Sequence, residues 1–161
     1  MIDKTGNTWD EVLPGLWQGG TPDEEWLHRR DTVGHGARDA RPFDAVVTLF
    51  SLARPFGPGV EELRFGFADA HPAHTDMDAV VRAARWAHER WRAGQRVLIR
   101  CQAGWNRSGL VTALVLMLDG WAAADAIERI RATRSPWALC NDDFAAWLLA
   151  SPVRPAAASA A

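Results

Sequence analysis

The chain has 161 residues and a mass of 17.7 kDa, and 48% of its residues are hydrophobic and 24% charged. This balance is typical of one soluble globular domain and excludes a disordered or fibrous chain. The formal net charge of -2 lacks the concentrated positive charge that nucleic acids and anionic membranes attract, so neither is expected as a partner.

Cysteine content and apolar runs indicate the compartment. Two cysteines are too few for a disulfide framework, and the N-terminal sequence MIDKTGNTWDEV lacks the apolar stretch of a signal peptide. The longest apolar run, Leu110 to Leu118, is too short to span a bilayer. We therefore expect a cytoplasmic monomer in a reducing compartment, where cysteines more often bind metals or catalyse than form disulfides.

The first half of the chain predicts short strands joined by loops. A Thr-Pro pair followed by DEEWLHRR predicts a short helix after the first strand, because threonine caps helices and acidic residues favour their N-termini. Apolar runs rich in β-branched or aromatic residues predict strands, and segments rich in proline and glycine predict loops. In chain order, these are a strand at 12–20 interrupted by Pro14-Gly15, a helix at 21–30, a loop at 31–43, a strand at 45–50, a loop at 51–60 and a strand at 63–67.

The second half predicts one buried strand and four helices. The clearest helix covers 75–94, because its apolar residues recur at helical spacing. Thr75 with Asp78 resembles a capping box at its start, and Gly94 supplies a left-handed stop. The remaining elements are a strand at 97–99 and helices at 108–119, 122–133 and 142–150.

The alternation of strands with helices predicts the fold class. It indicates an α/β domain whose central, mainly parallel sheet is flanked by helices. We expect a single domain over residues 1–150 and a flexible C-terminal tail at 151–161, where the sequence offers little to pack.

The sequence VLIRCQAGWNRSGLVTALVL (97–116) carries the chemistry. A buried strand ends, a short loop follows, and a buried helix begins, so that loop amides and the positive end of the helix together form an anion site. Gly104 allows close approach or a positive φ, and the planar fork of Arg107 matches phosphate oxygens. The residues expected to bind phosphate are Gln102, Ala103, Gly104, Trp105, Asn106 and Arg107.

Cys101 lies at the floor of this predicted loop. The amides that attract phosphate also stabilise a thiolate, and a thiolate beneath bound phosphate is a nucleophile aimed at phosphorus, which predicts a cysteinyl-phosphate intermediate. A bare Cys-x5-Arg is a weak motif in an arginine-rich chain. The preceding strand, Gly104 within the loop, Ser108 after it and the apolar helix make the pattern specific.

Over residues 12 to about 149, the chain resembles the cysteine-dependent protein tyrosine phosphatases, and in particular their dual-specificity subfamily. VLPGLWQGG resembles the opening phrase of the subfamily, AVVTLF its next strand, and NDDF (141–144) its closing phrase. The resemblance implies a phosphatase fold of the dual-specificity type and a phosphomonoester hydrolase without metal or cofactor. It makes Cys101 the nucleophile, Arg107 the phosphate-binding arginine and Ser108 the hydroxyl that assists release of the thiolate.

The resemblance also implies a general-acid aspartate some thirty residues upstream. The candidates are Asp69, Asp76 and Asp78. Asp69 directly follows a predicted strand, whereas the other two fall in the first turn of a helix, where acidic residues are expected for the dipole. Asp69 is therefore the predicted acid, and then the base toward water. His71 and His74 share its loop and are expected to be solvated, with a part in shaping the loop or in catalysis as the alternatives.

Four further residues attract competing interpretations. Arg100 replaces the histidine that the family usually has before the nucleophile; its charge also favours a thiolate, but a buried guanidinium needs partners. Asn106 is expected to bond within the loop. Trp105 either packs beside an aromatic phosphoester or shields the loop. Cys140 is expected to be a small buried apolar residue, with a redox partnership with Cys101 as the alternative.

The substrate ranking follows from the loop charges. The residues between Cys101 and Arg107 are uncharged, which favours phosphotyrosine or phosphoserine/threonine peptides first. Small metabolites or inositides come second, and RNA 5′ ends third. Two other classes stay open: a phosphate-binding pseudophosphatase that turns over poorly, and sulfur transfer of the rhodanese type, which leaves Asp69 without a role.

Overall fold

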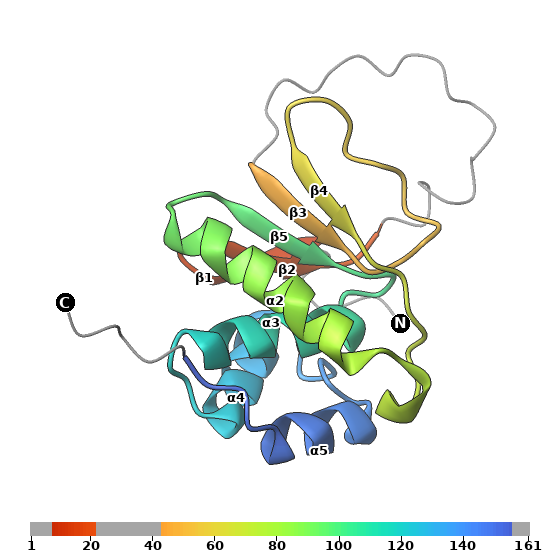
Figure 1. Ribbon diagram of the computed structural model, residues 1–161, viewed down its shortest axis with the longest axis vertical. Helices are drawn as coiled ribbons and strands as arrows, with labels where there is room; N and C mark the ends of the chain where they lie inside the picture. The colour runs from red at the N-terminus through yellow and green to blue at the C-terminus, as the bar shows by residue number, and fades with distance from the viewer. Residues whose placement is uncertain (1–7, 22–42, 156–161) are drawn as a thin grey trace.

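The computed structural model describes residues 8–21 and 43–155 of the chain. The expected helix after Thr21 and the loop up to residue 42 lie outside the described residues. Within them, five strands form one sheet and helices pack beside it (Figure 1). The elements are β1 (Trp9–Leu13), β2 (Leu16–Gly19), β3 (Ala45–Thr48), β4 (Glu61–Arg64), η1 (Pro72–His74), α2 (Met77–Arg92), β5 (Val97–Arg100), α3 (Arg107–Leu118), α4 (Ala123–Thr133) and α5 (Asp142–Ala150).

The sheet has the order β1-β2-β5-β3-β4. Only β1 and β2 pair antiparallel, whereas β5 runs parallel to β2 and β3, and β4 runs parallel to β3. The prediction of a mainly parallel sheet flanked by helices is therefore confirmed. Parallel strands end at a common edge, where open α/β sheets place their ligand sites. The central strand, β5, ends at that edge immediately before Cys101.

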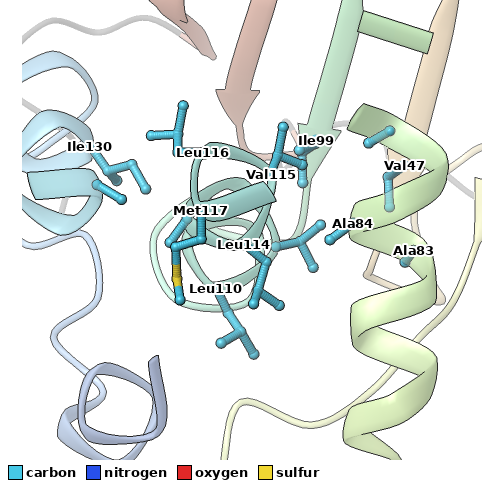
Figure 2. Close-up of a cluster of buried hydrophobic side chains, with 14 of the residues drawn as sticks. Val47, Ala83, Ala84, Ile99, Leu110, Leu114, Val115, Leu116, Met117 and Ile130 are labelled. Carbon is cyan, nitrogen blue, oxygen red and sulfur yellow. The ribbon is translucent and has the colours of Figure 1, made fainter. Parts of the chain in front are cut away.

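Helix α3 forms the middle of the core. All its residues from Ser108 to Leu118 are buried, and Figure 2 shows its side chains directed toward the sheet, toward α2 and toward Ile130 of α4. Each fully buried leucine contributes roughly 1.5–3 kcal/mol of transfer free energy. From Ser108 onward, the first turn of α3 is thus buried in the core. No helix in the described ranges is both long and apolar enough to cross a membrane.

The opposite face of the sheet carries a smaller cluster. Side chains alternate along a strand, so Val46 and Leu98 face away from the helices, while their neighbours Val47 and Ile99 join the main core. Val46 and Leu98 pack with Phe43, and aromatic residues cover them: Trp9, Trp17 and Phe56.

Strand β4 differs from the prediction, which placed it at 63–67. It pairs with β3, and this pairing stops where β3 ends, with Phe65 N donating to Thr48 O at 2.9 Å. Phe65 and Phe67 continue beyond the sheet and pack on the main core instead, with their ring centroids 5.6 Å apart. Their alternation reflects this packing and not a strand.

The start of α2 is also corrected. Asp76, not Thr75, caps the helix, and its Oδ1 accepts from Ala79 N at 3.0 Å. Thr75 closes the preceding η1 turn, because its amide donates to Pro72 O at 3.0 Å. The expected stop is confirmed: Gly94 follows the helix with a φ of +87°.

The chain continues along the core after α5. Ser151 is buried and Val153 packs against the main hydrophobic cluster. The packed part of the protein thus extends past the expected boundary at residue 150, and residues 156–161 lie outside the described part.

Candidate active site

The loop from Cys101 to Asn106 joins the end of β5 to the first turn of α3. Its first two carbonyl oxygens are bound from outside by one residue. Thr21 donates from its hydroxyl to Cys101 O at 3.0 Å, and from its amide to Gln102 O at 2.8 Å. The chain directly after β2 thus holds the start of the loop.

The next two carbonyl oxygens are bound by buried side chains. Arg134, only 5% exposed, donates to Ala103 O at 3.3 Å and to Gly104 O at 3.2 Å, and it pairs with Asp10 at 2.6 Å. Gln18 Nε2 adds a second bond to Gly104 O at 3.1 Å. A charged group braces this part of the loop from behind.

The direction of these carbonyls fixes the direction of the amides. Trp105 O is also bound from outside, by Leu139 N at 3.1 Å. In a planar trans peptide the C=O and N–H groups point to opposite sides, so outward carbonyls turn the loop amides inward. Gly104 N does so and donates to Cys101 Sγ at 3.3 Å. The loop is therefore a cradle for an oxyanion at a helix N-terminus.

Glycines let this cradle lie against β2. Gly104 has a φ of +78°, and a Cβ there would lie 2.4 Å from Gly19 C and 2.5 Å from Gly20 N. A Cβ on Gly20 would in turn lie 2.7 Å from Gln102 O. Backbone thus meets backbone, which only glycine allows. The opening phrase VLPGLWQGG acquires a physical role, because its last two glycines support the loop.

Cys101 and Ser108 meet inside the cradle. Cys101 is 2% exposed and Ser108 is fully buried, and Sγ lies 3.3 Å from Ser108 Oγ. Gln18 Nε2 donates to the same hydroxyl at 3.3 Å. The predicted nucleophile is thus enclosed by the loop, with a hydroxyl beside its sulfur.

Arg107 begins α3 directly after the loop, and its guanidinium contacts Phe67 and Phe50. Nη1 donates to Phe67 O at 3.1 Å, and Cζ lies 5.5 Å from the centre of the Phe50 ring. Nε is buried and has no hydrogen-bond partner among the described residues. A buried donor of this kind costs roughly 1–3 kcal/mol unless an acceptor satisfies it, which points to an anionic ligand. Within residues 8–21 and 43–155, no three His, Cys, Asp or Glu side chains are grouped to hold a metal.

Asp69 is the acidic candidate that contacts the loop. Its Oδ2 accepts from Asn106 Nδ2 at 2.9 Å, and its Oδ1 accepts from Asn141 Nδ2 at 2.8 Å. Asp76 instead caps α2, and Asp78 lies in the first turn of that helix. The structure therefore brings Asp69, and not its two competitors, to the rim of the cradle.

No family model matches the sequence, and no curated protein matches it. Solved structures do match. Tk-PTP in its active form is 27% identical with a TM-score of 0.67, over 88% of this chain and 95% of that one. Human DUSP28 is 27% identical with a TM-score of 0.68, over 88% and 90%. A mouse putative dual specificity phosphatase complexed with zinc tungstate is 25% identical with a TM-score of 0.68, over 88% and 84%.

The chain is a phosphatase of the cysteine-dependent protein tyrosine phosphatase superfamily. Its similarity is to the dual-specificity members. The site of this phosphatase combines segments from β2, β5, the Phe67–Asp69 stretch and the turn before α5.

Sequence reasoning missed Asn141 as a partner of the acid. Its side chain caps α5, because Oδ1 accepts from Phe144 N at 3.2 Å. Its backbone N–H donates to Asn106 Oδ1 at 3.0 Å, and its side-chain Nδ2 donates to Asp69 Oδ1 at 2.8 Å. An asparagine before an apolar helical run signals an N-cap. Its second role depends on where the fold brings the start of α5, and the role of Arg134 depends on where the fold brings the end of α4.

Two smaller expectations are corrected. Cys140 is exposed, not buried, and its Sγ lies 3.5 Å from Asn106 Nδ2, because the turn before α5 folds over the rim of the loop. His71 is exposed, as expected, and it also caps η1, because its Nδ1 accepts from Ala73 N at 3.0 Å. Asn106 bonds Asp69 and Asn141 beyond its own loop.

Proposed function

We propose that this phosphatase hydrolyses phosphoesters of tyrosine, serine or threonine in proteins through a cysteinyl-phosphate intermediate on Cys101. One observation carries the mechanism: a buried sulfur, 3.3 Å from both the Gly104 amide and the Ser108 hydroxyl, lies at the floor of a loop whose carbonyls from Cys101 to Trp105 are bound from outside. The phosphoryl group would be bound directly above that sulfur.

The first step transfers the phosphoryl group to sulfur. The inward amides and the guanidinium of Arg107, whose Nε is an unsatisfied buried donor, bind the phosphoryl oxygens and stabilise the charge that develops on them. The Cys101 thiolate attacks phosphorus, so the S–P bond forms while the P–O ester bond breaks. Asp69 donates a proton to the departing oxygen, and the dephosphorylated hydroxyl leaves.

The second step regenerates the enzyme. Asp69, now a carboxylate, accepts a proton from a water molecule whose oxygen attacks phosphorus. The new P–O bond forms, the S–P bond breaks, and phosphate is released. Ser108 is placed to donate a hydrogen bond to the departing thiolate, because its hydroxyl lies 3.3 Å from Sγ.

Charge around the rim supports a protein substrate. The residues between Cys101 and Arg107 bear no charge, and Asp142 and Asp143 are exposed at the start of α5, directly after the residue that holds Asp69. These carboxylates disfavour substrates with several phosphates by like-charge repulsion. Phosphopeptides carry one phosphate on an otherwise adaptable chain and avoid this repulsion.

The cysteine is tested by a matched pair of variants. Cys101→Ser should abolish release of phosphate from para-nitrophenyl phosphate while the protein still binds tungstate, an oxyanion of similar shape. Cys140→Ser, which removes the other thiol, should leave turnover unchanged. Normal turnover of Cys101→Ser would contradict the covalent mechanism, and a wild-type protein that binds tungstate without turnover would be a pseudophosphatase.

The substrate class is tested by a panel at equal concentration. Phosphotyrosine and phosphothreonine peptides should show higher kcat/KM than inositol phosphates and 5′-phosphorylated RNA. A preference for an inositol phosphate would overturn the protein assignment and leave the chemistry intact. The monomeric state and the cytoplasmic location stay predictions, to be checked by sedimentation and cell fractionation.

A further inference from the structure

Arg100, the residue immediately before Cys101, is completely buried. Its guanidinium turns to the sheet face that carries the aromatic cluster, whereas Cys101 belongs to the core on the helix face. Nε donates to Thr48 Oγ1 at 3.0 Å, Nη2 donates to Arg54 O at 2.5 Å, and Cζ lies 4.3 Å above the Phe56 ring. The charge is thus engaged with β3 and with the segment that follows it.

Glu62 on β4 supplies the compensating charge. Its Oε1 lies 3.5 Å from Arg100 Nη2, and its carboxylate also accepts from Thr48 Oγ1 at 2.8 Å, Phe56 N at 2.9 Å and Arg64 Nη1 at 2.7 Å. Burial alone raises the pKa of this carboxyl, but these hydrogen bonds and the charge of Arg100 hold the pKa below its usual value. The pair is therefore ionised and well hydrogen-bonded, as a buried ion pair must be.

Arg64, Arg100 and Glu62 together bind one segment, residues 50–56, here named the wall loop. Arg64 Nη2 donates to Ser51 O at 3.3 Å and to Ala53 O at 2.7 Å. Arg100 binds the next carbonyl, that of Arg54, and Glu62 accepts the amide of Phe56. The wall loop is fixed by charged side chains at four successive points.

The wall loop reaches the phosphate site through Phe50. This ring is 8% exposed and lies 5.5 Å from Arg107 Cζ. Phe50 O accepts from Ala53 N at 3.1 Å, and the preceding residue, Leu49, donates to the carbonyl of Arg100 itself at 2.8 Å. The backbone at Phe50 is therefore bonded to the wall loop on one side, and the backbone just before it is bonded to Arg100 on the other. These bonds position the Phe50 ring against the Arg107 guanidinium.

We propose that Arg100 is a positioning residue that sets oxyanion affinity through the wall loop. With Glu62 and Arg64 it fixes Phe50 against Arg107, and the Arg107 fork is thereby oriented before phosphate binds. It acts through these contacts and not through the sulfur of Cys101. The inference rests on the proposed function for its biological meaning, but its measurement is one of anion binding.

The experiment uses the Cys101→Ser protein, so that turnover plays no part, and titrates tungstate by calorimetry. Arg100→Met should weaken tungstate binding roughly tenfold, since small displacements of a positioned group are costly. Arg64→Met, which loosens the wall loop without touching β5, should weaken it roughly threefold. Arg100→Lys keeps the charge but loses the fork, and its affinity should lie between those of Arg100→Met and the parent.

Arg90→Met is the matched control. Arg90 lies on α2 and pairs at 2.8 Å with Glu61, which is on β4 like Glu62 and Arg64. None of its hydrogen bonds or ion pairs reaches the wall loop, so its loss should leave tungstate affinity unchanged. A folded Arg64→Met protein with unaltered affinity would overturn the inference, even if Arg100→Met fails to fold. In the active enzyme, the same variants should lower kcat/KM in the same order as they weaken tungstate binding, with KM raised; a fall in kcat with KM unchanged would also overturn the inference.

Discussion

The two halves of the candidate active site are held in different ways. The anion loop is braced from behind by backbone groups and by Arg134, which is buried and paired with Asp10 at 2.6 Å. Asp69 is held at the exposed rim by two neutral side-chain amides, those of Asn106 and Asn141. Buried charge-assisted hydrogen bonds contribute more than exposed neutral ones. The predicted anion loop is thus held by buried groups of the fold, while the position of Asp69 depends on two contacts at the surface.

The largest effect is expected from a substitution in the exposed half of the site that removes its carboxyl group. Asp69→Asn should lower kcat by roughly 10²–10⁴, the usual contribution of general acid–base catalysis. The loss should be greater for alkyl phosphoesters than for para-nitrophenyl phosphate, because para-nitrophenolate departs without a proton. Asp78→Asn, exposed in the first turn of α2, should behave as wild type. Equal rates for Asp69→Asn and wild type on both substrate types would move the acid elsewhere.

The next largest effect is expected from a substitution that removes the buried contacts behind the loop. Arg134→Met leaves the Asp10 carboxylate without its guanidinium and removes donors from two loop carbonyls. It should lower the free energy of unfolding by about 3 kcal/mol, as breaking one side of a buried ion pair does, and weaken tungstate binding with it. Urea unfolding and calorimetry check both, with the exposed Arg85→Met as control. A destabilised protein with unaltered tungstate affinity would show that the Arg134 contacts stabilise the fold without affecting anion binding by the loop.

A smaller effect tests whether the acid can be moved alone. Asn141→Asp keeps an oxygen to cap α5, so stability should hold, but it replaces the donor to Asp69 with a repelling carboxylate. We expect kcat to fall roughly tenfold and tungstate affinity to stay unchanged. The comparison fails if both quantities fall together. Steady-state kinetics and calorimetry on the same preparation measure the two.

The smallest effect concerns pH and the buried side. The pKa of Glu62 is held below its ordinary value of 4.5, so this carboxylate stabilises the folded state above that pH, and its contribution is lost as pH falls through the lowered folded value. The free energy of unfolding should therefore decline toward acid pH more steeply in wild type than in Glu62→Gln. Identical slopes in urea titrations from pH 3 to pH 6 would show that Glu62 does not contribute.

Local patterns were enough to predict the strand, loop and helix around Cys101. Each depends on neighbouring residues: an apolar strand, a glycine in a tight loop, an apolar helix. Position along the chain also singled out Asp69 as the predicted acid, and the structure places it in contact with the loop. The partners of Asp69 and the loop could not be found this way, because Arg134 and Asn141 come from distant segments that only the packed fold brings near. Thr75 shows the limit of local patterns: both Thr75 and Asp76 are suitable helix caps by residue type, and only the backbone geometry shows that Asp76 caps α2.

Because Gly104 packs directly against Gly19 and Gly20, the loop at 101–107 and the end of β2 cannot move independently. Residues 101–107 grafted into a foreign sheet would carry the sulfur and the guanidinium, yet a neighbouring strand with side chains would push the backbone outward. Any transplant of this chemistry therefore has to move both segments. Alanine at Gly104 would displace Gly19 and Gly20, and alanine at Gly20 would displace Gln102 and Ala103 of the loop.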